Sequence, residues 1–317
     1  MRVGLVDVDA FNRKKFTFPN LSLMKLSAFH KAQGDTVEWY RPLLGQYDRV
    51  YLSKIFGDEY SPDYPYVINA SEVVRGGSGY ALQVVEGNEC YAPLKDPPLP
   101  PDVDHIMPDY DLYDIADMAY GFLTKGCPRN CEFCHVSKMQ GPRVYTFAHL
   151  SEFWDGQKNI VLLDPNLTAS PECVSLLDEL AQSKAWIDFS QGLDIRCLTD
   201  EKINALNRVK WKRIHFAWDS PNEDLVPLFE HARELLNRWR KQTVSCYVLT
   251  NFNSTHDQDL SRIYALRKLG IQPDVRIYRK PTAPLETKKL QRWCSPRIFW
   301  SVERFDDYQN NKEDLRK

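Results

Sequence analysis

Gly126-Cys127-Pro128-Arg129-Asn130-Cys131-Glu132-Phe133-Cys134 is the stretch on which the interpretation of this 317-residue chain depends. Its three thiols are spaced so that a short loop can turn all three sulfurs toward one point. Soft thiolate ligands select iron–sulfur clusters, zinc or copper(I) over hard cations. Three cysteines are one fewer than the four that normally hold a [4Fe–4S] cluster or close a structural zinc site. The stretch therefore predicts a metal centre with one open position, where chemistry can take place.

The composition is that of an ordinary globular protein, with 43% hydrophobic and 26% charged residues. A net charge of −2 argues against bulk electrostatic binding to nucleic acid or to a membrane. No apolar run approaches the ~20 residues that span a bilayer. We therefore expect a cytoplasmic protein without a membrane partner. In that reducing compartment, the isolated cysteines are predicted to be small buried hydrophobes: Cys90, Cys173, Cys197, Cys246 and Cys294.

The cysteine stretch resembles the cluster motif of the radical S-adenosylmethionine (SAM) superfamily. Cys127, Cys131 and Cys134 match its C-x3-C-x2-C pattern, and the aromatic Phe133 stands directly before the third cysteine. The resemblance implies a [4Fe–4S] cluster whose fourth iron is chelated by the amino and carboxylate groups of SAM. One electron would then cleave SAM to methionine and a 5′-deoxyadenosyl radical, which abstracts hydrogen from a substrate that the sequence does not identify. An external electron donor, flavodoxin-like or ferredoxin-like, is the partner that this chemistry implies.

The context of the motif is a repeated alternation of short apolar strands and helical stretches over residues 115–280. Strands are predicted at 118–123, 159–163, 186–190, 213–218, 244–249 and 275–278. Six strands instead of eight predict a partial (β/α)6 TIM-type barrel with an open side. The cysteines follow the first strand directly, and the loops at the carboxyl ends of barrel strands are where reactive groups lie.

Polar residues follow the later strands, and the resemblance implies that such residues bind SAM. The positions concerned are Asp164 and Asn166, Gln191, Asp194 and Arg196, Asp219 and Ser220, and Thr250 and Asn251, together with Phe133. The family's glycine-glycine-glutamate motif is absent at 164–166, where a tight turn is the alternative. Asp194 and Arg196 could instead form an exposed ion pair worth under ~1 kcal/mol. His215 lies inside a strand and is predicted to be a core histidine rather than a ligand.

Residues 1–90 predict a small Rossmann-like parallel α/β domain. The apolar runs at 3–8, 36–40 and 49–53 read as strands, and a helical pattern begins at Leu21. This segment resembles, in degenerate form, the cobalamin-binding-type domain that precedes many radical SAM barrels. The D-x-H-x-x-G motif that ligates cobalt is absent, and His30 is the only histidine of the segment. Base-on cobalamin is therefore not expected, and cobalamin is kept only as an alternative cofactor.

Two further segments complete the predicted organisation. Residues 91–114 are rich in proline and predict an ordered, extended linker rather than a core element. Residues 281–317 form a C-terminal extension, and positions 276–300 hold seven Lys or Arg against one acid, interleaved with Trp293, Phe299 and Trp300. Basic and aromatic groups together can bind nucleic acid or a phosphorylated substrate. Alternatively, the aromatic rings pack onto the barrel while the charges stay solvated.

The sequence is compatible with three functions. The first is a radical SAM enzyme of unassigned reaction. The second is a cobalamin-dependent radical SAM methyltransferase. The third, from a different class, is a zinc-stabilised binding module without catalysis, in which His135 completes a Cys3His site; adjacent residues rarely chelate one tetrahedral ion, which weakens this reading. Methylthiotransferases are not favoured, because only Cys90 lies in the N-terminal segment.

Overall fold

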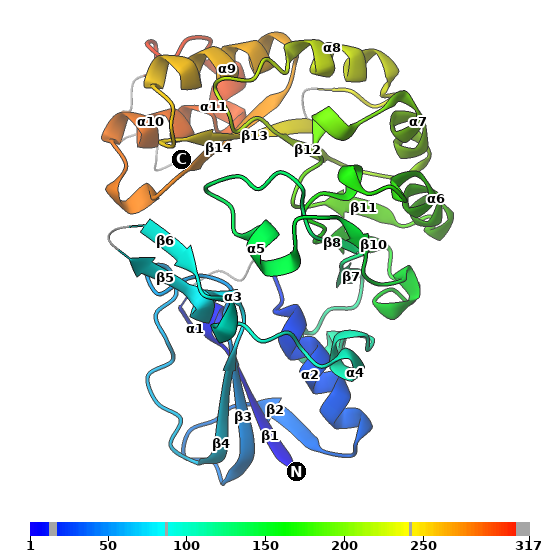
Figure 1. Ribbon diagram of the computed structural model, residues 1–317, viewed down its shortest axis with the longest axis vertical. Helices are drawn as coiled ribbons and strands as arrows, with labels where there is room; N and C mark the ends of the chain where they lie inside the picture. Colours follow the sequence, from blue (N-terminus) through cyan, green and yellow to red (C-terminus); the bar gives the residue numbers. More distant parts are fainter. Residues whose placement is uncertain (13–17, 86–87, 241–242, 309–317) are drawn as a thin grey trace.

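The computed structural model describes residues 1–12, 18–85, 88–240 and 243–308. A smaller α/β unit carries the N-terminus and faces a larger one built from the rest of the chain (Figure 1). The loop that leads into α5 lies between the two (Figure 1). No helix in the described part of the chain is both long and apolar enough to cross a membrane.

The N-terminal unit is built on a four-stranded parallel sheet in the order β2-β1-β3-β4. The strands are β1 (Arg2–Asp7), β2 (Thr36–Trp39), β3 (Tyr47–Ser53) and β4 (Ala70–Gly76). Helix α2 (Leu21–Ala32) begins at Asn20, whose side chain accepts a hydrogen bond from the Leu23 amide. Its buried residues pack against Val3 and Leu5 of β1. The parallel α/β layer expected from the sequence is therefore present.

The strand order reverses between β1 and β3, since the chain runs from β1 to one side and from β3 to the other. In open parallel sheets, ligands bind at the carboxyl ends of the strands at such a switch point. Asp7 and Ser53 end the two strands concerned. Gly77 follows β4 with φ +94°, and a Cβ there would lie 2.4 Å from the Lys54 carbonyl oxygen. Only glycine fits that position, so the turn brings the backbone close to this edge of the sheet.

The remaining short elements of the N-terminal half surround this edge. They are α1 (Val8–Asn12), α3 (Ser78–Ala81), the hairpin β5 (Leu82–Val85) with β6 (Asn88–Tyr91), η1 (Pro93–Lys95), α4 (Pro101–Asp104) and η2 (Tyr110–Tyr113). Val103 of α4 is buried against Leu23 and Leu26 of α2. The proline-rich segment thus contributes to a core, and the expectation of an extended connector outside the core is wrong at this point. The apolar side chain of Val103 covers a part of the α2 surface that would otherwise face water. The domain boundaries themselves stay predictions.

The larger unit contains six parallel strands in two three-stranded sheets, ordered β7-β10-β11 and β12-β13-β14. Their bounds are β7 (Met118–Gly121), β10 (Asn159–Leu162), β11 (Trp186–Phe189), β12 (Ile214–Ala217), β13 (Val244–Thr250) and β14 (Gln272–Ile277). Isolated parallel bridges, Ile187 to Trp211 and Leu193 to Phe216, connect the two sheets. The six predicted strands are confirmed, as is the mixed α/β class with parallel sheets.

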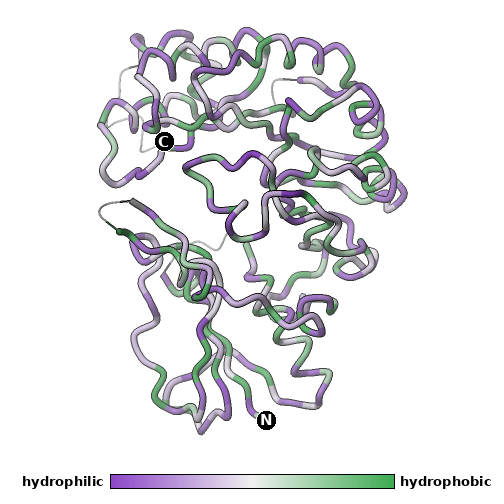
Figure 2. The backbone as a smooth tube through the Cα atoms, in the orientation of Figure 1, coloured by the Kyte–Doolittle hydropathy of each residue, from purple (hydrophilic) through white to green (hydrophobic). Residues whose placement is uncertain are grey.

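Helices connect these strands and cover one face of the sheets (Figure 1). They are α6 (Cys173–Ser183), α7 (Asp200–Arg208), α8 (Val226–Leu235) and α9 (His256–Lys268), with short turns η3 (Leu150–Glu152), η4 (Leu167–Ala169) and η5 (Ile195–Cys197). Hydrophobic and hydrophilic residues alternate along the outer helices, as expected for helices with one buried face (Figure 2). Their apolar sides join the strands in one continuous core.

The C-terminal extension packs onto this core through η6 (Lys280–Thr282), α10 (Leu285–Trp293) and α11 (Pro296–Ser301). Trp293 and Phe299 are fully buried, and the Arg267 guanidinium lies 4.1 Å from the centre of the Phe299 ring. The packing interpretation of these two aromatic residues is confirmed. A nucleic-acid or phosphorylated partner stays a prediction, and residues 309–317 of the predicted extension lie outside the described residues.

Candidate functional site

The three cysteines of the motif lie on one loop between β8 (Thr124–Lys125) and α5 (Val136–Gln140), just beyond the carboxyl end of β7. All three are free thiols and half-buried. A turn brings two of them together in the chain, because the Cys134 amide donates to the Cys131 carbonyl over 3.0 Å. The Cys127 amide donates to the Gly141 carbonyl over 3.1 Å, which closes the base of the loop. We refer to residues 126–135 as the cysteine loop.

Gly126 allows the cysteine loop to fold against the chain that returns from it. Its φ is +88°, and a Cβ at this position would lie 2.0 Å from the Arg143 carbonyl oxygen. Gly141 has a similarly positive φ of +97°, but a Cβ there would meet nothing within 4 Å. The two glycines share a backbone conformation that would strain any residue with a Cβ, and they differ in the space around them.

We expect Gly126→Ala to reduce stability by at least about 2 kcal/mol more than Gly141→Ala, because only the first adds a clash with backbone to the strain of positive φ. Urea unfolding followed by circular dichroism measures the difference. The same Gly126→Ala protein should also bind less iron, since the clash lies one residue before Cys127. Equal losses for the two variants would show that the close approach to Arg143 is unimportant.

The thiols share one electrostatic environment. Burial raises the pKa of Cys131, and the nearby Asp219 carboxylate and the other two sulfurs raise it further. Burial likewise raises the pKa of Cys134, with Cys127 and Asp219 acting in the same direction. A bound cation offsets this penalty, because it stabilises the thiolates that ligate it. Within the described residues, however, no three His, Cys, Asp or Glu side chains are gathered closely enough to hold a single metal ion.

Three predicted residues from two loops meet beside Cys127. The Asn166 amide nitrogen lies 3.7 Å from the Cys127 sulfur and 3.5 Å from Asp194 Oδ2. Arg196 Nε donates to Asp194 Oδ1 over 2.6 Å. The Asp194 side chain is only 5% exposed. The alternative of an exposed Asp194–Arg196 pair is therefore wrong, because the loop after β11 turns this carboxylate inward.

Two residues that the sequence did not single out complete this arrangement. Arg129 of the cysteine loop bonds Glu223 Oε1 over 2.9 Å and lies 3.8 Å from Asp194. Arg196 Nη1 bonds the other Glu223 oxygen over 2.5 Å. Two guanidinium groups and two carboxylates thus form a closed ring that ties the cysteine loop to the loops after β11 and β12. Arg129 stands within the motif, whereas nothing in the local sequence marks Glu223.

The Asp164 carboxylate is engaged by the chain itself. It accepts hydrogen bonds from the Leu123 amide (3.1 Å) and from both the amide (2.5 Å) and the hydroxyl (2.7 Å) of Thr124. Burial raises the pKa of Asp164 to about 6. Its observed role is to hold the segment that leads into the cysteine loop, and contact with SAM stays a prediction.

Asp219 and Ser220 follow β12 on the side of the cysteines. Burial raises the pKa of Asp219 to about 6, against the opposing effect of Arg196 and Arg262. Arg262 also holds the backbone here, donating to the Asp219 carbonyl over 3.0 Å. The Ser220 hydroxyl accepts from the Asn222 amide over 3.2 Å, which shapes the turn. Asp219 thus places a carboxyl group with a shifted pKa near Cys131 and Cys134.

The other predicted residues serve different contacts. The Phe133 ring packs edge-on against Phe252 with centroids 5.5 Å apart, so the cysteine loop touches the segment after β13. Thr250 is fully buried and directs its hydroxyl to the Arg276 carbonyl, while the Asn251 amide donates to the Tyr278 carbonyl over 2.8 Å. Gln191 is exposed and lines the cavity described next. Among the described residues, no hydrogen bond or ion pair joins Thr250, Asn251 or Gln191 to the ring beside Cys127.

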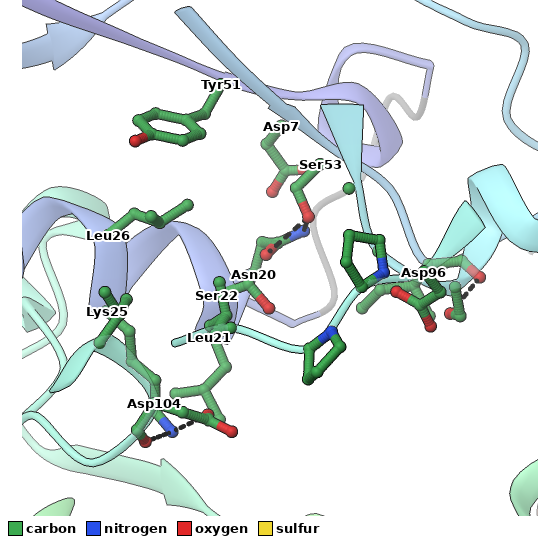
Figure 3. A pocket seen from close by; sticks show the side chains of 18 of the residues that line it. Asp7, Asn20, Leu21, Ser22, Lys25, Leu26, Tyr51, Ser53, Asp96 and Asp104 are labelled. Carbon is green, nitrogen blue, oxygen red and sulfur yellow. Dashed lines mark hydrogen bonds and ion pairs between the residues drawn. The ribbon is translucent and has the colours of Figure 1, made fainter. Parts of the chain in front are cut away.

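A cavity of about 960 Å³ lies between the two units, at the switch point of the N-terminal sheet. Figure 3 shows Asp7, Asn20, Ser22 and Ser53 around it. The buried Asp9 Oδ1 has no hydrogen-bond partner within the described structure. Asp7 and Asp9 supply acceptors, whereas Asn20, Ser22 and Ser53 can both donate and accept, so the lining suits a large polar ligand.

One carboxylate connects this cavity to the cysteine loop. Asp104 bonds Lys25 of α2 over 2.8 Å and Lys125 of β8 over 3.1 Å. Lys125 directly precedes Gly126, and all three charged residues line the cavity. The cavity therefore extends to the residue that directly precedes the cysteine loop.

Comparison with known proteins identifies the fold. The chain is similar to the radical SAM methyltransferase TsrM from Kitasatospora setae with cobalamin and a [4Fe–4S] cluster bound, with a TM-score of 0.56 and 12% identity over 87% of this chain and 74% of that one. The TsrM structure with tryptophan substrate and the SAM analogue aza-SAM gives the same TM-score and identity over 86% and 72%. No family model matches the sequence, and no curated protein does. At this identity the likeness establishes a radical SAM-type fold.

Proposed function

We propose that this chain is a radical SAM enzyme that holds a [4Fe–4S] cluster with Cys127, Cys131 and Cys134. The observation that carries the proposal is the position of the three free thiols on one loop after β7, in a fold similar to that of an enzyme with such a cluster. The donor set fits, because three thiolates suit iron–sulfur clusters and leave one iron for another ligand. With SAM bound, the cluster supplies the electron that splits SAM and yields the 5′-deoxyadenosyl radical.

In this proposal, the residues around the cysteines position the cysteine loop and bond to its sulfur. The six parallel strands form a partial barrel, and its mouth is lined by the strand-end loops. Arg129, Asp194, Arg196 and Glu223 hold the cysteine loop in place through their ring of ion pairs. Asn166 can donate a hydrogen bond to the Cys127 sulfur, and such bonds tune cluster potentials. The substrate and the net reaction stay open, as does the electron donor.

Anaerobic reconstitution tests the proposal. The protein should take up about four iron and four sulfide ions per chain and, with a reductant, convert SAM to 5′-deoxyadenosine. A cluster without any cleavage of SAM would remove the activity, and stoichiometric zinc without iron or sulfide would favour the binding module.

The zinc module loses support from the surroundings of His135. His135 Nε2 lies 3.1 Å from Glu89 of β6, and its ring stacks on Tyr91. This histidine is thus engaged with the N-terminal hairpin. Its Nδ1 is buried and has no hydrogen-bond partner in the part of the chain that the structure describes.

A cobalamin-dependent methyl transfer is the second candidate, and the cavity favours it. Its volume of about 960 Å³ is at the upper end for cofactor sites. TsrM holds cobalamin within a similar fold. No histidine is among the described residues that line the cavity, and His30 is bound to Asp35 and Tyr51 instead. The lining therefore fits cobalamin only without a histidine ligand to cobalt.

Ser22→Trp places an indole into this cavity from α2, and we expect it to reduce cobalamin binding by more than about tenfold, since the ligand and the ring would compete for space. Retention of cobalamin after gel filtration measures the effect, and iron content should be unchanged. Ser175→Trp on the exposed surface of α6 is the control. If the wild-type protein retains no cobalamin, this second candidate is wrong.

A further inference from the structure

The inner face of the second sheet is unusually polar. The residues of β12, β13 and β14 whose side chains enter the core, such as Phe216, Cys246 and Val275, face the helices. The alternate residues face the other way. On these three strands they include His215, Ser245, Tyr247, Asp274 and Arg276, which we call the inner-face set. Parallel strands are normally apolar on both faces, so a polar set here requires an explanation.

Three members of the inner-face set form a stack. The rings of His215 and Tyr247 are parallel to within 2°, with centroids 5.2 Å apart. The Arg276 guanidinium carbon lies 4.5 Å from the centre of the Tyr247 ring. The register pairs His215 with Ser245 and Arg276 with Leu249, so Tyr247 lies between the two along the strands. Arg276 is therefore the layer closest to the carboxyl ends of the strands, where the cysteine loop lies.

The stack is held in place from below and from the side. The Tyr247 hydroxyl donates to the Ser190 carbonyl over 2.9 Å. His215 Nδ1 is 2.6 Å from the Ser245 hydroxyl. Burial lowers the pKa of His215 to about 4, with the charges of Arg213 and Arg276 acting in the same direction. His215 is thus a neutral ring at neutral pH, and it adds no second positive charge beneath Arg276. His215 is half-buried, hydrogen-bonded and stacked, as predicted for a satisfied histidine rather than a ligand, but it lies outside the hydrophobic core cluster.

Arg276 itself is oriented but only partly engaged. One of its terminal nitrogens bonds Asp274 over 2.9 Å, and its side chain is 57% exposed. A guanidinium carries five N–H donors in a planar fork that matches carboxylate and phosphate oxygens. Stacking on Tyr247 fixes the plane of that fork before a ligand arrives, which lowers the entropy cost of binding.

We propose that Arg276 binds a carboxylate or phosphate group of the substrate on this inner face, with Tyr247 setting the plane of the guanidinium. The assignment rests on the radical SAM function proposed above and names the chemical class of its substrate. Phe133 of the cysteine loop contacts Phe252, which contacts Tyr278 two residues beyond Arg276. A substrate anchored at Arg276 would thus lie on the side of the sheet that leads to the cysteines.

The charged groups near Arg276 include one that competes with an incoming anion for the guanidinium. Asp274 pairs with it directly, whereas Asp188 lies within β11 and Arg213 directly precedes β12 at its amino end. The Asp274 carboxylate is therefore the internal competitor of an incoming oxyanion. Its removal should strengthen binding, whereas removal of Arg276 should weaken it.

The test uses the full chain and two separate probes, inorganic phosphate and benzoate, at constant ionic strength. The denaturation midpoint is measured as each probe is raised to about 50 mM, because a ligand of the native state stabilises it by mass action. The wild type should show a saturable rise with at least one probe. Arg276→Gln should need at least about tenfold more probe, and Asp274→Asn about threefold less. Arg304→Gln is the matched control, since Arg304 also pairs with an aspartate two residues away but on an exposed surface.

The outcomes separate this inference from the proposed function. The absence of a saturable rise in the wild type overturns the inference. An unchanged response of Asp274→Asn also overturns it. The expected result for this variant is tighter anion binding, which misfolding cannot imitate. If Arg304→Gln weakened the response to the anion as much as Arg276→Gln does, the anion would bind generally to the surface, and the inference would again be overturned. Reductive cleavage of SAM by the wild type is measured independently. Anion binding without SAM cleavage would remove the radical SAM function and leave Arg276 as an anion site.

Discussion

Replacement of Cys127, Cys131 or Cys134 by alanine, one at a time, is expected to abolish the iron–sulfur cluster and the cleavage of SAM. Iron should fall from about four to less than about one per chain, since two thiolates do not retain a cube that three hold. Formation of 5′-deoxyadenosine should fall by more than about a hundredfold, because the cofactor and not the protein carries the difficult chemistry. Iron and sulfide analysis, the visible spectrum and chromatography of the products measure these effects.

Cys90→Ala is the matched control for these variants. Cys90 is an exposed free thiol on β6, outside the cysteine loop, so the prediction that this cysteine is buried is wrong. It should leave iron, sulfide and SAM cleavage unchanged within error. If any one of the three loop variants kept wild-type iron and spectra, the proposed cluster and its ligands would be wrong.

Arg262→Ala is expected to cause the largest loss of stability among single replacements outside the cysteine loop. Arg262 of α9 is only 3% exposed. Its guanidinium donates to the carbonyls of Trp218 (2.7 Å), Asp219 (3.0 Å) and Leu249 (2.9 Å) and to the Asp259 carboxylate (2.5 Å). The alanine variant leaves a buried carboxylate and three carbonyls without their partner. Breaking a buried pair in this way costs about 3–5 kcal/mol.

Urea unfolding at neutral pH checks this value. Arg208→Ala is the control, because Arg208 bonds Asp178 on the surface with half of its side chain exposed, and it should cost less than about 1 kcal/mol. The double variant Arg262→Ala/Asp259→Ala should lose less than the sum of the single variants, since no unpaired carboxylate remains. A loss below about 1 kcal/mol for Arg262→Ala would show that water satisfies these carbonyls and that the arginine does not support the strand ends.

The secondary structure of the larger unit could be predicted because its strands are continuous apolar runs bounded by polar turns. Val244–Thr250 and Asn159–Leu162 are examples, and each is buried along most of its length. The β5–β6 hairpin was not predicted, and neither was the burial of Val103. The burial of Val103 depends on Leu23 and Leu26 of α2, far along the chain, and a local pattern contains no information on such partners. The hairpin pairs neighbouring residues, but each of its strands is only four residues long and forms no extended apolar run.

The residues of the candidate site also fall into two groups, those that the local sequence indicates and those that it does not. The cysteines were found because their spacing is itself the chemical signal. Asn166, Asp194 and Arg196 were found because parallel strands place their carboxyl ends at one edge. Glu223 and Arg262 were missed, since an ordinary acid and an ordinary helical arginine carry no local mark. The sequence predicted His215 to be a satisfied histidine, but a strand sequence does not show which of its two faces packs against the helices.

By itself, the sequence determined the three thiols, the α/β class and the succession of the strands along the chain. These follow from residue spacing and from runs of apolar residues. Only the tertiary structure decided which charges meet: the ring beside Cys127, the buried Arg262 and the Arg276–Tyr247–His215 stack. Each of these joins residues from separate loops or strands. Their pairing depends on how the sheets and helices pack, and the burial that gives the pairs their strength exists only after that packing.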